Sequence, residues 1–175
     1  MRRRTSKASV EKFMSALARH ARSDCSVYFT GGVTAVMMDW RDSTVDIDLK
    51  FEPELDEVFR SLPELKESLE INIELAAPSD FIPELPGWRD RCRFITAIGK
   101  VSFYHYDPYS QALAKIERGH TQDVADIQSM LEDGLIERKK LVQLFEQIKV
   151  NLYKYPAVDP AKFTEAVNQI ALPAE

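Results

Sequence analysis

Residues 46–51 read Asp-Ile-Asp-Leu-Lys-Phe and alternate strictly between polar and apolar side chains. Successive side chains of a β-strand point to opposite faces, so this segment predicts a strand with one buried, apolar face. The same alternation places Asp46 and Asp48 together on the other face. A chain containing such a strand needs a sheet that is covered on one side.

A glycine pair precedes this strand. The β-rich run 26–30 ends at Gly31-Gly32, and the apolar segment 33–38 after it is long enough for one or two helical turns. Glycines at the start of a helix let backbone N–H groups approach a phosphate closely. The sequence therefore predicts a strand, a glycine turn and a short helix that could receive an anion.

The remaining pattern predicts an α+β fold. In the first part we expect helices at 8–22, 54–62 and 63–69, a strand at 71–75, and a hairpin of strands at 93–98 and 101–106. From Asp107-Pro108, an N-cap followed by proline, helices follow one another at about 108–118, 121–132, 137–153 and 160–171. We expect a mixed β-sheet core flanked by helices over residues 1–106 and a C-terminal helical subdomain over residues 107–175.

Composition excludes several classes of protein. The net charge of −5 gives no basic field for holding long duplex DNA, and no apolar run approaches the 18 residues of a membrane span. The two cysteines form no CxxC pair, which argues against a zinc site and fits a reducing compartment. We therefore expect a cytoplasmic protein that works without a membrane.

The aspartate pair can bind a metal ion or be solvated surface charge. Side chains two residues apart on a strand have Cα atoms roughly 6.5 to 7 Å apart, so both carboxylates can converge on a cation. Hard oxygen ligands suit Mg²⁺ or Mn²⁺. The strand at 71–75 offers a third acidic group, Glu74, with Asn72 on the same face. A phosphate cradle with carboxylates is typical of metal-assisted phosphoryl or nucleotidyl transfer.

These motifs resemble those of the DNA polymerase β-type nucleotidyltransferase superfamily. The glycine pair followed by R-D-S-T-V-D-I-D at 41–48 is similar to a compact bacterial branch that includes nucleotidyltransferase-like toxins of toxin–antitoxin and abortive-infection systems. The segments Q-A-L-A-K-I-E-R at 111–118 and D-V-A-D-I at 123–127 resemble the helical K…R…D-x-x-D segment of that branch. The resemblance spans about residues 26–131.

The resemblance implies a role for each matching residue. Gly31 and Gly32 would contact the triphosphate. Thr44 would position the start of the following strand or contact phosphate. Asp46 and Asp48 would hold Mg²⁺. The helical segment would neutralise phosphate charge through Lys115, with Asp123 or Asp126 orienting Lys115 or Arg118 or taking part in the chemistry.

Two positions depart from the superfamily pattern. A β-branched residue, Val33, directly follows the glycines, and the third carboxylate is not an obvious aspartate. We expect Glu74 in the third metal position because the amide of Asn72 carries no charge. With Asn72 there, only two carboxylates remain.

The leading expectation is a Mg²⁺- or Mn²⁺-dependent enzyme that transfers a nucleotidyl group from a nucleoside triphosphate to RNA, such as a tRNA end, or to a protein hydroxyl. One alternative is a catalytically inactive nucleotide-binding module on the same fold. Another is an interaction protein, such as a neutralising partner or a dimer subunit, that acts through its helical half and could have an antitoxin partner. An interaction protein should need neither Asp46 nor Asp48, whereas an inactive binder should hold nucleotide without turning it over.

Overall fold

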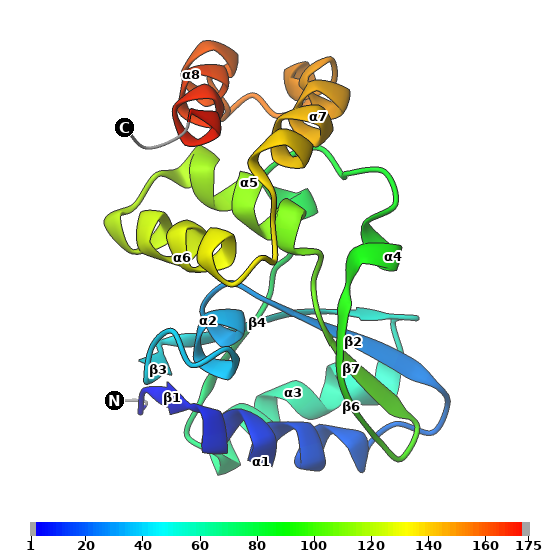
Figure 1. The fold of residues 1–175 in the computed structure, drawn as a ribbon. Helices are drawn as coiled ribbons and strands as arrows, with labels where there is room; N and C mark the ends of the chain where they lie inside the picture. Colours follow the sequence, from blue (N-terminus) through cyan, green and yellow to red (C-terminus); the bar gives the residue numbers. More distant parts are fainter. Residues whose placement is uncertain (1–2, 173–175) are drawn as a thin grey trace. The chain divides into compact units, whose positions relative to one another are not determined.

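The structure, a computed structural model, describes residues 3–172 and divides into two compact units (Figure 1). The first unit runs up to Ala77 and includes Cys92–Tyr106; the second contains Pro78–Arg91 and the chain from Asp107 onward. A mixed sheet and helices make up the described residues, which confirms the expected α+β class. Within residues 3–172, no helix has the length and apolar character that crossing a membrane requires.

A five-stranded mixed sheet forms the centre of the first unit. Its strand order is β5-β4-β2-β7-β6. The central strand β2 (Cys25–Thr30) runs antiparallel to β4 (Asp46–Glu52) and parallel to β7 (Val101–His105). At the two edges, β5 (Asn72–Leu75) lies parallel to β4, and β6 (Arg93–Ile98) forms the expected hairpin with β7.

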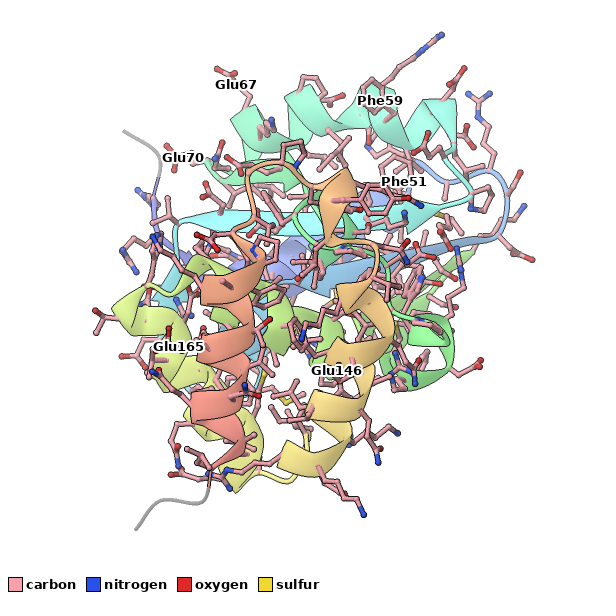
Figure 2. All side chains as sticks on the ribbon, turned by 90° about the horizontal axis from the view of Figure 1, so that it is seen from above. Phe51, Phe59, Glu67, Glu70, Glu146 and Glu165 are labelled. Carbon is pink, nitrogen blue, oxygen red and sulfur yellow. The ribbon has the colours of Figure 1, made fainter. Side chains whose placement is uncertain are left out.

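Helices α1 (Lys7–Ala18) and α3 (Asp56–Ser68) cover one face of this sheet (Figure 1). Their apolar side chains pack with the inward side chains of the central strands into one core cluster. The outer face of α3 is charged, and Glu67 points away from the ribbon (Figure 2). The expected alternation along β4 is present, since its apolar side chains are buried in this cluster and its polar ones lie on the opposite face.

A single helix, α3, replaces the two short helices expected at 54–62 and 63–69. Pro63 lies inside α3 and not at the start of a second helix. Proline lacks the N–H that would bond to the carbonyl of Phe59 one turn earlier. Because Phe59 and Pro63 are both exposed, water can satisfy that carbonyl, and burial of the apolar side of α3 keeps the helix continuous.

The second unit is helical. It contains the turn η1 (Pro78–Asp80), the short helix α4 (Trp88–Arg91), α5 (Pro108–Arg118), α6 (Thr121–Glu132), α7 (Arg138–Lys149), the turn η2 (Leu152–Lys154) and α8 (Pro160–Ala171). Two of these helices begin at the expected aspartate caps: the carboxylate of Asp107 accepts the Tyr109 N–H and that of Asp159 accepts the Ala161 N–H, each at 3.0 Å. Phe145 and Phe163 pack edge to face at 4.8 Å and join α7 to α8.

A buried ion pair holds the segment 78–91 in the helical unit. Arg91 Nη2 lies 2.9 Å from Oδ2 of the fully buried Asp107, at the start of α5. Arg91 Nη1 also donates to the carbonyl of Pro86 at 2.8 Å. These contacts explain why a segment that precedes residue 106 in sequence groups with the helices that follow it.

Candidate active site

The glycine turn closes tightly on the neighbouring strand. Gly31, with φ of +64°, follows β2, and α2 (Gly32–Met37) begins directly after it. A Cβ on Gly31 would lie 2.8 Å from Oδ2 of Asp48, and one on Gly32 would lie 2.1 Å from Oγ1 of Thr44. The structure therefore brings together the two glycines, Thr44 and Asp48, and leaves no room for a side chain on either glycine.

Replacing Gly32 by alanine is expected to destabilise the first unit. The new methyl group would meet Cβ of Thr44 at 2.8 Å as well as its hydroxyl, so rotating the threonine side chain cannot remove the overlap. Such overpacking typically costs about 1–3 kcal/mol of unfolding free energy. Urea unfolding followed by circular dichroism measures the loss. Adding Thr44→Ala should restore part of the stability, and an unchanged midpoint for Gly32→Ala alone would contradict the observed close contact.

A two-stranded ribbon holds the segment before the aspartate strand. In it β1 (Thr5–Ser6) pairs antiparallel with β3 (Ser43–Thr44), with Thr5 opposite Thr44. Arg4, the residue before β1, donates from Nε to Oγ of Ser43 in β3 at 2.7 Å. The N-terminal segment thus fixes the position of Thr44, whose hydroxyl contacts the glycine turn.

The pairing of β4 with β2 and β5 determines which residues lie opposite Asp46 and Asp48. Asp48 lies opposite Thr30 of β2 on one side and opposite Glu74 of β5 on the other. Asp46 lies opposite Asn72, and Asn72 Nδ2 donates a hydrogen bond to Oδ1 of Asp46. All of these polar residues are on the sheet face away from α1 and α3.

Asp46 and Asp48 are suitable ligands for a divalent cation, but they are only two carboxylates. Asp46 and Asp48 are hard oxygen donors on one strand face, beside a glycine turn that a Cβ would fill, and such donors suit Mg²⁺ or Mn²⁺. In the described residues 3–172, no three side chains of histidine, cysteine, aspartate or glutamate gather as a metal site. Glu74 is exposed, although it lies beside Asp48 in the register.

Helix α2 is anchored by a buried histidine. His105, at the end of β7, has Nδ1 3.0 Å from Oγ1 of Thr34 in α2, and both side chains are buried. A helix of six residues has little stability of its own. This contact therefore helps to set the orientation of the helix that starts at the glycine turn.

The same histidine should make the first unit sensitive to acid. Burial, together with the charge of Arg93, lowers the pKa of His105 from 6.5 to about 4. The unfolded chain then binds more protons than the folded one between those values, so stability is full above pH 6.5 and falls as the pH drops toward 4. The loss should approach about 3 kcal/mol. Urea midpoints measured from pH 7.5 to 4 should show a shallower decline for His105→Gln, which does not titrate; an identical decline would contradict this assignment.

In the helical unit, the residues of the expected K…R…D-x-x-D segment form one ion-pair network. Lys115 Nζ lies 2.8 Å from Asp126 Oδ2 and 3.5 Å from Asp123 Oδ1, and all three residues are buried. The guanidinium of Arg118, which is partly exposed, donates to both oxygens of Asp123 at 2.8 and 2.5 Å. The network joins α5 to α6.

Opposing effects act on Asp123. Burial raises the pKa of its carboxyl, but the hydrogen bond from Arg118 and the charges of Lys115 and Arg118 outweigh burial and lower the pKa below its usual value. The carboxylate therefore stays ionised at neutral pH. It serves as the shared acceptor between the buried lysine and the arginine.

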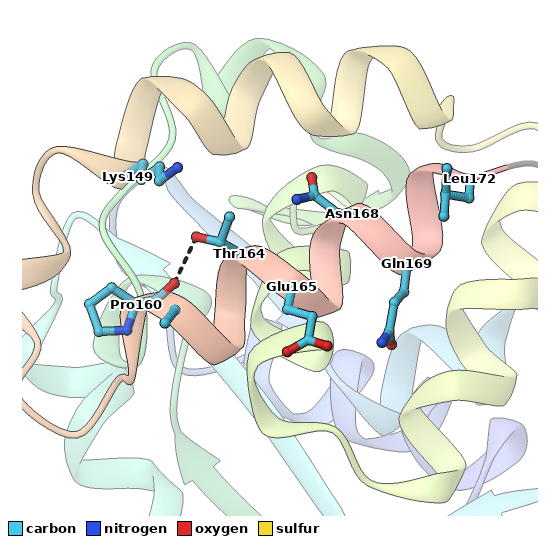
Figure 3. A pocket seen from close by; sticks show the side chains of 8 residues that line it. Lys149, Pro160, Thr164, Glu165, Asn168, Gln169 and Leu172 are labelled. Atoms are coloured by element: carbon cyan, nitrogen blue, oxygen red, sulfur yellow. Dashed lines mark hydrogen bonds between the residues drawn. The ribbon is translucent and has the colours of Figure 1, made fainter.

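A surface hollow of about 620 Å³ is also present on the helical unit (Figure 3). Side chains of α8 such as Thr164, Glu165 and Asn168 line it, together with Lys149 of α7. The hydroxyl of Thr164 donates to the carbonyl of Pro160 at 2.7 Å. None of the expected site residues lines this hollow, so we do not assign chemistry to it.

A mixed sheet in which a glycine turn closes on Thr44 of β3 and Asp48 of β4 is consistent with a nucleotidyltransferase-like fold. A family model described as "Nucleotidyltransferase of unknown function (DUF6036)" matches residues 8–167, and the chain belongs to that family. Comparison with curated proteins and with solved structures gives no match. The matched range covers both units and every expected site residue.

Proposed function

We propose that this protein is a Mg²⁺- or Mn²⁺-dependent nucleotidyltransferase of the DNA polymerase β type, in the compact bacterial branch that resembles toxins of toxin–antitoxin and abortive-infection systems. Membership of a nucleotidyltransferase family supports the reaction class. The observation that carries the proposal is the contact of the Gly31–Gly32 turn with Asp48 and Thr44. This contact supports the proposal, because a glycine turn at a helix start suits phosphate binding and the adjacent Asp48 carboxylate suits a hard cation.

The first unit contributes the phosphate and metal ligands in this proposal. Backbone N–H groups at Gly31 and Gly32 bind the triphosphate, and Thr44 holds the turn. The cation would be held by Asp46 and Asp48. Glu74 lies on the same face of the sheet, opposite Asp48 in the register of β5 against β4. When bound, the cation neutralises triphosphate charge and stabilises the leaving pyrophosphate.

The reaction is an in-line displacement at the α-phosphorus. A hydroxyl oxygen of the acceptor forms a bond to the α-phosphorus, the bond from that phosphorus to the oxygen bridging it to the β-phosphorus breaks, and pyrophosphate leaves. The hydroxyl proton passes to a base or to water. In the helical unit, Lys115 pairs with Asp123 and Asp126, and Arg118 pairs with Asp123. These pairs support the orienting role that the resemblance implies for the two aspartates.

Transfer is tested by incubating the protein with Mg²⁺, total cellular RNA and protein, and each of the four α-³²P-labelled nucleoside triphosphates in turn. We expect Mg²⁺-dependent label in one acceptor class, RNA or protein, because the proposed reaction leaves the α-phosphate on the acceptor. A nucleoside triphosphate substrate fits a cytoplasmic location, as does a chain with two cysteines and no CxxC motif. Absence of label in both classes with all four nucleotides would contradict transfer.

A second candidate function is a nucleotide-binding or antitoxin-pairing module without catalysis. The hydrogen bond from Asn72 to Asp46 favours it, because an amide stands where a third carboxylate would strengthen metal binding. Such a module would bind Mg²⁺-nucleotide and give no label. A pure interaction module would show neither nucleotide binding nor label. Its effect on a partner would persist after substitution of Asp46 and Asp48.

A further inference from the structure

The residue beside Asp46 on the neighbouring strand is an amide. Asn72 stands opposite Asp46 in the parallel pairing of β4 with β5, and its Nδ2 donates to Asp46 Oδ1. An ionised carboxylate only accepts hydrogen bonds, so the amide must present its N–H₂ group, and not its oxygen, to Asp46. The chemistry therefore settles which way the amide faces.

This contact limits what Asn72 can offer a cation. Toward Asp46 it supplies a neutral donor, where an aspartate at this position would supply a second negative charge. A carboxylate that binds a metal is commonly held in place by such a hydrogen bond. Asn72 thus orients Asp46 and adds no charge to the site.

Glu74 does not act as the third metal-binding carboxylate in place of Asn72. It lies one pleat further along β5, opposite Asp48, and its side chain is exposed. Among residues 3–172, no three acidic, histidine or cysteine side chains lie together as a metal site. Asp46, Asp48 and Glu74 therefore do not form such a group of three. Among residues 3–172, β4 therefore supplies two carboxylates to the proposed site, Asp46 and Asp48, and these balance the charge of one divalent cation apart from the charge that the triphosphate brings.

We propose that Asn72 is a positioning residue that orients Asp46 and restricts the site to one divalent cation for each bound nucleotide. The proposal rests on the proposed function, because it assumes that Asp46 and Asp48 bind metal and nucleotide. It goes beyond that function by stating how many cations bind and which residue sets that number.

The test counts bound Mn²⁺ by electron paramagnetic resonance, with the protein saturated by an α,β-methylene nucleoside triphosphate that cannot be turned over. We expect one Mn²⁺ per bound nucleotide for the unchanged protein and two for Asn72→Asp. Asn72→Ala should keep a count of one at saturation but bind Mn²⁺ about 10- to 100-fold more weakly, the usual effect of losing a residue that orients a ligand. Glu74→Gln should leave the count and the affinity unchanged.

Several results would overturn the inference. Two Mn²⁺ in the unchanged protein would show that the amide sets no limit, and a weaker affinity in Glu74→Gln would make Glu74 a ligand. The count in the unchanged protein decides the question even if Asn72→Asp fails to fold. Nucleotide binding with no Mn²⁺ at all, or no nucleotide binding, would instead overturn the proposed function, and this inference with it.

Discussion

Changing Asp46 and Asp48 together to asparagine is expected to abolish Mg²⁺-dependent nucleotide binding while the fold stays intact. Both side chains are half-buried on the polar face of β4, opposite the apolar core cluster, so neutral amides of the same shape fit without repacking the core. The change removes both negative charges of the proposed cation site. Because losing even an outer partner of a metal site weakens binding about 10- to 100-fold, the loss here should be at least about 100-fold.

Isothermal titration with a Mg²⁺-nucleotide analogue measures this loss, and circular dichroism checks the fold. The matched control is Glu52→Gln, which removes one carboxylate from the same face of the same strand, six residues from Asp46. It should bind the nucleotide as the unchanged protein does. Equal loss in the control would point to general charge on the strand and not to a site at Asp46 and Asp48.

Replacing Lys115 by methionine is expected to produce the largest loss of stability. The ammonium group lies 2.8 Å from a carboxylate oxygen of Asp126 and 3.5 Å from one of Asp123, and both of these residues are buried. Removing one partner of a buried ion pair typically costs about 3–5 kcal/mol, because the other charge stays buried and uncompensated. Urea unfolding should therefore show an earlier transition for the helical unit.

Two further variants test whether the broken ion pair causes the loss of stability in Lys115→Met. Lys139→Met removes an exposed lysine at the start of α7 and should change the unfolding free energy by less than about 0.5 kcal/mol. Lys115→Met combined with Asp126→Leu removes both charges of the closer pair and should be more stable than Lys115→Met alone. If the double variant lost as much stability as the two single substitutions added together, the Lys115–Asp126 ion pair would not be the source of the instability of Lys115→Met.

The sequence patterns that repeat along an element predicted the structure well. The polar–apolar alternation of residues 46–51 depends only on strand geometry and on one covered face, and β4 has that form. The aspartate caps at Asp107 and Asp159 are equally local, and both accept the expected backbone N–H groups.

Contacts between distant segments were not predictable in the same way. Nothing in the spacing of Thr34 and His105 shows that the two residues meet, since the contact depends on how α2 packs at the end of β7. Which aspartate each of Asn72 and Glu74 faces depends on the register of β5 against β4, which pairs Asn72 with Asp46 and Glu74 with Asp48. The ion pair of Arg91 with Asp107 likewise depends on the path of the loop that precedes it.

The central claim is that Asp46 and Asp48 support metal-dependent nucleotidyl transfer, and the most direct measurement compares label transfer in matched reactions. The unchanged protein, the Asp46→Asn/Asp48→Asn variant and Glu52→Gln each receive the same α-³²P-labelled nucleoside triphosphate and acceptor mixture, with Mg²⁺ or with a chelator. The account predicts label from the unchanged protein and from Glu52→Gln with Mg²⁺ only, and none from the double aspartate variant. Equal label from the double variant would contradict the account.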